Sequence, residues 1–384
     1  MDTLNERIEY IDILRVVSML SVVFLHTAAG SLRGMIGSPV WHFSNILTSI
    51  MSTSVPIFFM ISGAVLMSSK KTLSLNITYK KRIPKILVPF IIWSIVAVAY
   101  YAAMNILSSG SIDWNMVTTK LRNLPAQPTT IHLWFMYALI PLYVLSPILK
   151  KLVDSLTNTL MLYMLAIWLV FSSVLPTLVQ FLPVKYQSLL ILNSSYNLNF
   201  MNGYLGYFLI GYYLMNYRKR ISKKLLAGII AADTAVIALG SWWKSIEAGS
   251  YSEFFKSYSK LFMLVLSIAI FLLVKELMAD HRLRGLVSKG VQVLSPLSFG
   301  VYLVHNLIVD YTSRKIILSP AASVPMLLLS YFIILSFSLI CIFILSSFKL
   351  TCFAFTGLPY KNACEACNIK YFWGRSSKLV PGKQ

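Results

Sequence analysis

Arg15 and His26 are two polar side chains inside a stretch of sequence, residues 13–29, that is otherwise apolar enough to enter a membrane. An α-helix turns by about 100° per residue, so these two positions point within about 20° of the same direction and lie about 16 Å apart along the axis. One helix face therefore carries a fixed positive charge near one membrane surface and an imidazole deeper in the bilayer. A neutral imidazole in a partly apolar site accepts a proton from a hydroxyl group, which is general-base chemistry.

The same pair is open to a purely structural interpretation. An arginine near a membrane surface extends its charged group to the lipid headgroups, and a histidine between two helices is often a hydrogen-bonded contact without a chemical role. The spacing alone does not separate this interpretation from a catalytic one.

The composition places the chain in a membrane. Of its 384 residues, 57% are hydrophobic and only 12% are charged, which excludes an ordinary soluble protein. A net charge of +21 suggests nucleic-acid binding in a soluble protein, but here the lysines and arginines lie between apolar runs, where they orient the chain and meet anionic lipid headgroups. We therefore predict an all-α, polytopic integral membrane protein that contacts the lipid bilayer and binds no nucleic acid.

About ten stretches are long and apolar enough to cross a bilayer as helices. Basic residues are concentrated in alternate connecting loops, which by the positive-inside rule places those loops and both termini in the cytoplasm. The polar loops on the other side, 108–130 and 183–199, either line an outward-facing site or are plain connectors. A transmembrane domain over 1–348 and a basic cytoplasmic tail over 349–384 are expected. The predicted spans are 13–30, 43–67, 86–107, 133–149, 160–182, 200–215, 225–243, 261–277, 296–317 and 324–348.

The other four histidines differ in their expected surroundings. His305 lies near the middle of the ninth predicted span, where it needs a partner or a wet cavity, so we expect it to line the site. His132 opens the fourth span, and its structural alternative is a place in the aromatic belt at the membrane surface. His42 and His281 lie at a helix start and in a basic loop, so they are expected on the surface.

Four cysteines lie at or after the last span, on the side where thiols are expected to stay reduced. Cys364 and Cys367 form a single C-x-x-C pair without a second pair or a nearby histidine. No metal site is therefore expected.

A series of short motifs gives the chain a family resemblance. They are Tyr10-Ile-Asp12-Ile-Leu-Arg15 followed by ten residues and His26, Ser54-Val-Pro-Ile-Phe-Phe-Met-Ile-Ser-Gly63, Lys81-Arg82-Ile-Pro-Lys85 with Pro89, His132-Leu-Trp134, Tyr143, Gly211, and Ser298-Phe-Gly-Val-Tyr-Leu-Val-His305. In this order they resemble the membrane acyltransferase 3 family over residues 7 to 348. Within it the chain looks closest to inner-membrane O-acetyltransferases of bacterial surface polysaccharides, such as the one acting on enterobacterial common antigen. Ala64 departs from the aromatic residue that is usual there.

The resemblance implies a reaction and its partners. The family transfers an acyl group, most often acetyl from cytoplasmic acetyl-CoA, to a hydroxyl of a sugar or lipid-linked glycan. The implied protein is a multi-pass enzyme of the bacterial inner membrane that uses acetyl-CoA as co-substrate and needs no further cofactor.

The resemblance also implies roles for single residues. His26 would be the general base on the acceptor hydroxyl, and a transient acyl-imidazole on the same ring is the open variant. Arg15, held by Asp12 one helical turn before it, would bind a donor phosphate together with Arg82 and Lys85. The expected pocket residues are Ser62, Gly63, His132, Trp134, Tyr137 and His305.

A transporter or flippase of a polar or lipid-linked solute is the alternative from another functional class. In that reading Arg15, His26 and His305 form an intramembrane binding and proton-coupling site. The sequence shows no internal repeat of the kind that many transporters carry.

Overall fold

The computed structural model describes residues 8–188, 190, 203–315 and 321–367, and these residues form helices and connecting turns without any β-strand. The all-α prediction is confirmed. In chain order the helices are α1 (Glu9–Leu32), α2 (Pro39–Met51), α3 (Ser54–Ser68), η1 (Lys70–Leu73), α4 (Leu75–Ile77), η2 (Thr78–Arg82), α5 (Ile83–Ser109), α6 (Trp114–Asn123), η3 (Ile131–Leu133), α7 (Trp134–Ser155), α8 (Asn158–Leu169), η4 (Val170–Val174), α9 (Leu175–Val179), α10 (Val184–Gln187), α11 (Leu205–Asn216), α12 (Lys223–Ala248), η7 (Phe254–Lys256), α13 (Leu261–Asp280), α14 (Gly285–Lys315), α15 (Val324–Ser347), α16 (Lys349–Thr356) and α17 (Tyr360–Cys367).

Nine helical segments of the described chain are long and apolar enough to cross a membrane, which confirms the polytopic class. The sixth predicted span, 200–215, corresponds to α11, whose 12 residues are too few to cross a bilayer core. Residues 200–202 and 316–317 of the predicted spans, most of the predicted loop 183–199, and residues 368–384 of the tail lie outside the described residues. The nine segments are Glu9–Leu32, Pro39–Ser68, Leu75–Ser109, Ile131–Ser155, Asn158–Val179, Lys223–Ala248, Leu261–Asp280, Gly285–Arg314 and Val324–Ser347.

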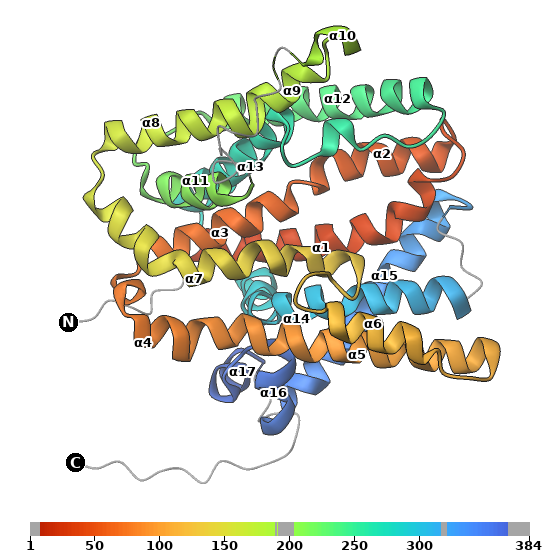
Figure 1. Cartoon of the computed structure of the whole chain (residues 1–384). Helices are drawn as coiled ribbons and strands as arrows, with labels where there is room; N and C mark the ends of the chain where they lie inside the picture. The colour runs from red at the N-terminus through yellow and green to blue at the C-terminus, as the bar shows by residue number, and fades with distance from the viewer. Residues whose placement is uncertain (1–7, 189, 191–202, 316–320, 368–384) are drawn as a thin grey trace, which may run out of the picture.

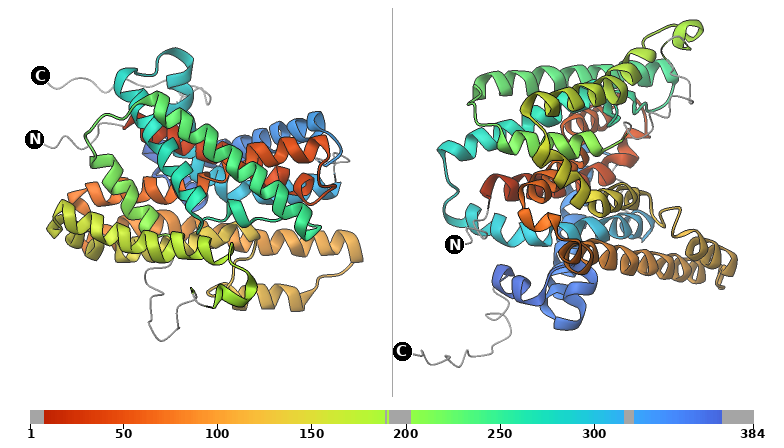
Figure 2. Two further views of the ribbon diagram at one scale, coloured as in Figure 1. Left: turned by 90° about the horizontal axis from the view of Figure 1, so that it is seen from above. Right: turned by 60° about the vertical axis from the view of Figure 1, so that its left-hand side comes forward.

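Helix α1 lies in the middle of the bundle (Figure 1). It contacts α2, α3, α13, α14 and α15, and most of its residues are buried. Figure 2 shows the same helix enclosed by others in the view from above. The polar groups of α1 therefore meet protein and not lipid, as intramembrane polar residues usually do.

The tightest crossing in the bundle joins α3 and α11, and it is made possible by two glycines. A Cβ atom on Gly63 would lie 1.7 Å from the carbonyl oxygen of Phe208, and one on Gly211 would lie 1.9 Å from that of Met60. Small residues let helix backbones approach this closely within a membrane. The crossing fixes the position of α3, whose neighbouring residue Ser62 belongs to the site described below.

Replacing Gly63 by alanine should loosen this crossing, because the new methyl group meets backbone atoms that cannot rotate away. Overpacking of this kind costs about 1–3 kcal/mol. We expect a clear fall in the thermal unfolding temperature of the detergent-purified protein. Gly228→Ala in α12 is the control, since nothing lies within 4 Å of its added Cβ. Equal unfolding temperatures for the two variants would contradict the described packing.

Candidate active site

Three histidines that are far apart in the sequence meet in the interior of the bundle. His26 comes from α1, His132 from η3 and His305 from α14. Their ring centroids lie 5.1 Å apart for His26 and His305, 5.0 Å for His132 and His305, and 6.1 Å for His26 and His132. His42 and His281 are exposed elsewhere, as predicted.

Hydrogen bonds use both ring nitrogens of His132. Its Nδ1 lies 3.0 Å from the Thr130 hydroxyl, and its Nε2 lies 3.2 Å from the carbonyl oxygen of Leu303. A carbonyl oxygen only accepts hydrogen bonds, so Nε2 donates, and in the neutral ring Nδ1 accepts from the hydroxyl. His132 is therefore held in place and is not available to exchange protons.

His305 keeps one ring nitrogen unused. Its Nδ1 lies 2.6 Å from the carbonyl oxygen of Tyr302, to which it must donate. In the neutral ring the other nitrogen, Nε2, then presents a lone pair, and this buried atom has no hydrogen-bond partner among the described residues. Leaving such an acceptor unpaired costs about 1–3 kcal/mol. The His26 ring is a close neighbour, with its centroid 5.1 Å from that of His305, but no hydrogen bond joins the two rings.

His26 is the least buried of the three rings. His132 is 2% exposed and His305 is fully buried, whereas His26 is only partly buried. The arrangement thus places one partly exposed imidazole beside two buried rings.

The three rings do not form a metal site. In the part of the chain that the structure describes, no group of three His, Cys, Asp or Glu side chains is arranged to hold a metal ion. The committed nitrogens of His132 give the physical reason. Cys341, Cys352 and Cys364 are free thiols, and the side chain of Cys367 lies outside the described residues.

A cavity of about 300 Å³ lies along the same face of α1, nearer its predicted cytoplasmic end. Arg15 and Lys85 are its basic lining residues, and Ser62 contributes a hydroxyl group. Lys85 is exposed and forms no ion pair with any described carboxylate. The rest of the lining is mainly apolar and aromatic. Such a cavity combines charge for an anionic group with an apolar channel for a thin chain.

Arg15, on α1, forms hydrogen bonds both within its own helix and to the neighbouring helix α14. Its guanidinium donates to Asp12 on α1 and to Ser295 on α14, each at 3.0 Å, and the Ser295 hydroxyl donates to the same carboxylate at 2.5 Å. Pro296 follows at once and interrupts the helical hydrogen bonding of α14 beside this contact. The predicted Arg15–Asp12 pair is present, and Ser295 extends it across the helix interface.

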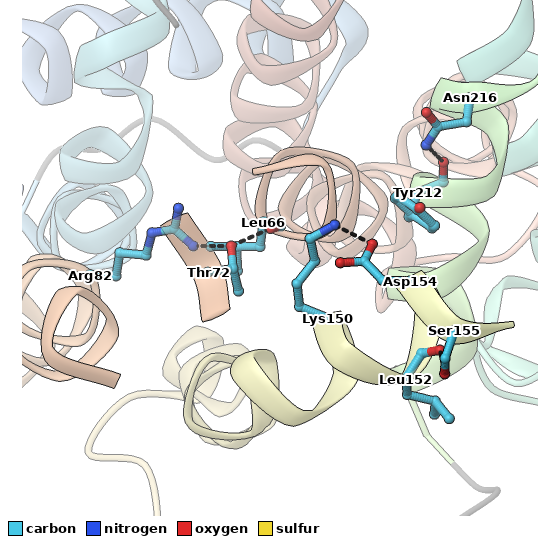
Figure 3. A network of polar contacts seen from close by, with 9 residues as sticks. All are labelled: Leu66, Thr72, Arg82, Lys150, Leu152, Asp154, Ser155, Tyr212 and Asn216. Atoms are coloured by element: carbon cyan, nitrogen blue, oxygen red, sulfur yellow. Dashed lines mark hydrogen bonds and ion pairs between the residues drawn. The ribbon is translucent and has the colours of Figure 1, made fainter. Parts of the chain in front are cut away.

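Arg82 is held by neutral groups (Figure 3). It donates to the Thr72 hydroxyl, which donates in turn to the carbonyl of Leu66, and it donates to Ser69 at 2.9 Å. These hydroxyls orient the guanidinium but do not neutralise its charge. Arg82 does not line the cavity itself, and its part in donor binding stays a prediction.

The ring of Tyr302 stands between the cavity and the histidines. It lines the cavity, and its centroid lies 5.5 Å from that of His132 and 5.9 Å from that of His305. Phe135, 5.5 Å from Tyr302, extends the same wall. The Tyr302 hydroxyl donates to the backbone carbonyl of His132. One aromatic ring therefore separates the end of the cavity from the imidazole cluster, and His26 does not line the cavity directly.

Comparison with known protein families decides the class. A family model described as an acyltransferase domain, that of the acyltransferase 3 family, matches residues 8–347. The chain belongs to the acyltransferase 3 family. No curated protein and no solved structure matches it. Membrane acyltransferase activity is therefore the established context in which the histidine cluster and the cavity are to be understood.

Three further residues predicted to shape the pocket of this acyltransferase lie away from the cavity. Gly63 packs against α11. Trp134 stacks on Tyr258, with 5.8 Å between the centroids. The Tyr137 hydroxyl lies against the carbonyl oxygens of Leu124 and Gln127, at 2.9 Å for Gln127. The predicted contacts of these three residues with substrate stay predictions.

Ser295 and Tyr302 line the cavity but were not predicted as site residues. Tyr302 precedes His305 by one helical turn, so the spacing places both on one face. Ser295 stands directly before a proline inside an apolar span. Both signals are visible in the sequence, but neither says which helix lies opposite.

Replacing Thr130 by valine should leave the buried Nδ1 of His132 without its donor. The expected cost is about 1–3 kcal/mol of stability, measured as a lower unfolding temperature in detergent, together with lower acyltransferase activity. Thr129→Val is the matched control, because the buried Thr129 hydroxyl already has no hydrogen-bond partner among the described residues. If both variants behaved alike, the hydrogen-bonded state assigned to His132 would be wrong.

Proposed function

We propose that this acyltransferase moves an acetyl group from cytoplasmic acetyl-CoA to a hydroxyl of a cell-surface polysaccharide or its lipid-linked precursor, in the bacterial inner membrane. The observation that carries the proposal is the partly exposed imidazole of His26, which the Tyr302 ring separates from a cavity lined by Arg15 and Lys85. The finer resemblance to O-acetyltransferases of surface polysaccharides supports the choice of acetyl and of a glycan.

The charged and apolar parts of the cavity lining match the chemical groups of coenzyme A, the proposed donor. Coenzyme A carries phosphates at one end and a thin, flexible arm that ends in the thioester. Arg15 and Lys85 offer positive charge for a phosphate, and Arg15 presents the planar fork that suits oxyanions. The apolar walls receive the arm. The thioester then lies next to Tyr302, which must move aside for the carbonyl carbon to reach the acceptor beside His26.

The acceptor is expected from the opposite end of α1. Arg33 follows His26 by seven residues, which returns to the same helix face. It lines a hollow of about 480 Å³ together with Tyr251 and Glu253. Charged and hydroxyl-bearing side chains suit a polar glycan. Donor and acceptor would thus approach His26 from the two ends of one helix.

The proposed transfer keeps protons and bonds in balance. His26 takes the proton of the acceptor hydroxyl while the oxygen attacks the thioester carbonyl. The tetrahedral intermediate collapses, the carbon–sulfur bond breaks, and the thiolate of coenzyme A receives the proton from His26. No hydrogen bond joins His26 to His305 Nε2 in the structure. We propose that during transfer the two rings move together and a ring N–H of His26 donates to this lone pair, which selects the tautomer whose free nitrogen faces the hydroxyl.

Removal of the base is the first test. With labelled acetyl-CoA and glycan precursors, wild-type protein in vesicles should label the glycan. His26→Ala should lower kcat by about 10²–10⁴-fold, the usual contribution of a positioned base. His42→Ala is the matched control, since His42 is exposed and lies outside the cluster. Solute movement across the vesicle without label transfer would instead support a transporter.

The proposed role of Arg15 in binding a donor phosphate is tested with a single and a double variant. Removing Arg15 alone would also break its ion pair with the buried Asp12. Asp12→Asn keeps the guanidinium and should leave the KM for acetyl-CoA close to that of wild type. Asp12→Asn combined with Arg15→Gln removes both charges together and should raise this KM about tenfold or more with little change in kcat. Equal KM values for the single and double variants would remove Arg15 from the donor site.

A further inference from the structure

The chain beyond the family domain folds back onto the donor cavity. The family match ends at residue 347, but α16 and α17 continue the chain along α5, α14 and α15. Figure 1 shows both short helices, in blue, beside α5. Three residues of the turn between them, Thr356, Gly357 and Leu358, line the cavity together with Lys85. We refer to these three residues as the C-terminal turn.

Two contacts fit the C-terminal turn closely against α5. Gly357 has a φ of +69°, and a Cβ atom there would lie 1.9 Å from the carbonyl oxygen of Lys85. Two helical turns further along α5, the indole N–H of Trp93 donates to the carbonyl of Phe355 at 2.9 Å, and the two rings meet edge to face at 5.4 Å. Only glycine permits both this backbone conformation and this approach.

Polar atoms of the C-terminal turn pair with one another and with Cys352 of α16. The Thr356 hydroxyl donates to the carbonyl of Cys352 at 2.6 Å and accepts from the backbone N–H of Leu358 at 3.2 Å. The Cys352 thiol donates to the Leu358 carbonyl at 3.3 Å. With these groups satisfied, the C-terminal turn offers the cavity mainly apolar surface beside the Lys85 charge.

We propose that the C-terminal turn is a positioning and specificity-determining part of the donor site. It forms the wall against which the arm of an acyl-coenzyme A packs, and it fixes the backbone of Lys85 so that the ammonium group meets a phosphate. This inference rests on the proposed function. It assigns a role to a segment that lies outside the matched family domain, and it assigns that segment no part in the chemical step.

Gly357→Ala tests the proposal in the full-length protein. The added methyl group displaces α16 from α5 and with it the wall and Lys85. The expected result is a rise of about fivefold or more in the KM for acetyl-CoA, with kcat changed less than about twofold. Gly110→Ala is the matched control: Gly110 also has a positive φ, +75°, at the other end of α5, but nothing lies within 4 Å of its added Cβ. Its KM should equal that of wild type.

Leu358→Trp gives a second test that does not depend on backbone strain. It tests the role of the C-terminal turn even if Gly357→Ala fails to fold. A larger side chain in the wall narrows the channel, so the KM for acetyl-CoA should again rise while kcat is retained. In wild-type protein, added desulfo-coenzyme A should slow amide hydrogen exchange in residues 349–358. Unchanged KM in Leu358→Trp together with unchanged exchange would overturn the proposal.

The two levels of inference fail in different ways. If wild-type protein transfers no label from acetyl-CoA, and desulfo-coenzyme A protects no amide, the proposed function fails and this inference fails with it. If wild-type protein is active but the variants of the C-terminal turn match Gly110→Ala, only the role of the turn is overturned.

Discussion

The unused lone pair on His305 Nε2 is the constraint on which the site depends. A buried acceptor in an apolar bundle must be paired or its cost reduces the stability of the fold. Because His305 donates through Nδ1 to Tyr302 and His132 is committed at both nitrogens, the ring that can meet this need is His26. In the proposed mechanism a hydrogen bond from His26 to this nitrogen would both pair the buried acceptor and set the tautomer of His26, so stability and chemistry would depend on one interaction.

Helix α1 places the residues proposed to bind the donor and to act as the base along one direction. Its regular pitch places Arg15 and His26 on one face, and Arg33 follows directly after its last residue. Helix α14 packs along α1 so that Ser295 meets the Arg15–Asp12 pair while His305 meets His26. In the proposed function a cytoplasmic thioester and an outer hydroxyl approach the imidazole from opposite ends. The Tyr302 ring lies between the cavity and the histidines.

The sequence was sufficient for the parts of the molecule that the bilayer dictates. Apolar length gives the spans, because backbone groups in hydrocarbon must pair within helices. A charge or an imidazole in such a span indicates a site, which is why Arg15, His26 and His305 were predicted as site residues. The sequence did not predict the surroundings of residues that are placed by contacts between distant segments. The hydroxyl of Tyr137 lies against loop carbonyls, Gly63 serves the α3–α11 crossing, and the C-terminal turn lines the cavity. Hydrophobic periodicity in the sequence does not reveal such partners, which for Gly63 and Gly357 lie more than a hundred residues away along the chain.

The most direct measurement is a structure of the full-length protein in lipid with a non-transferable acetyl-CoA analogue. In this analogue a methylene group replaces the sulfur atom of the thioester. The account predicts phosphate density beside Arg15 and Lys85, the arm between α5 and the C-terminal turn, a displaced Tyr302 ring and the acetyl carbonyl next to His26. An analogue bound elsewhere, or one whose carbonyl remains on the far side of an unmoved Tyr302 ring, would contradict it.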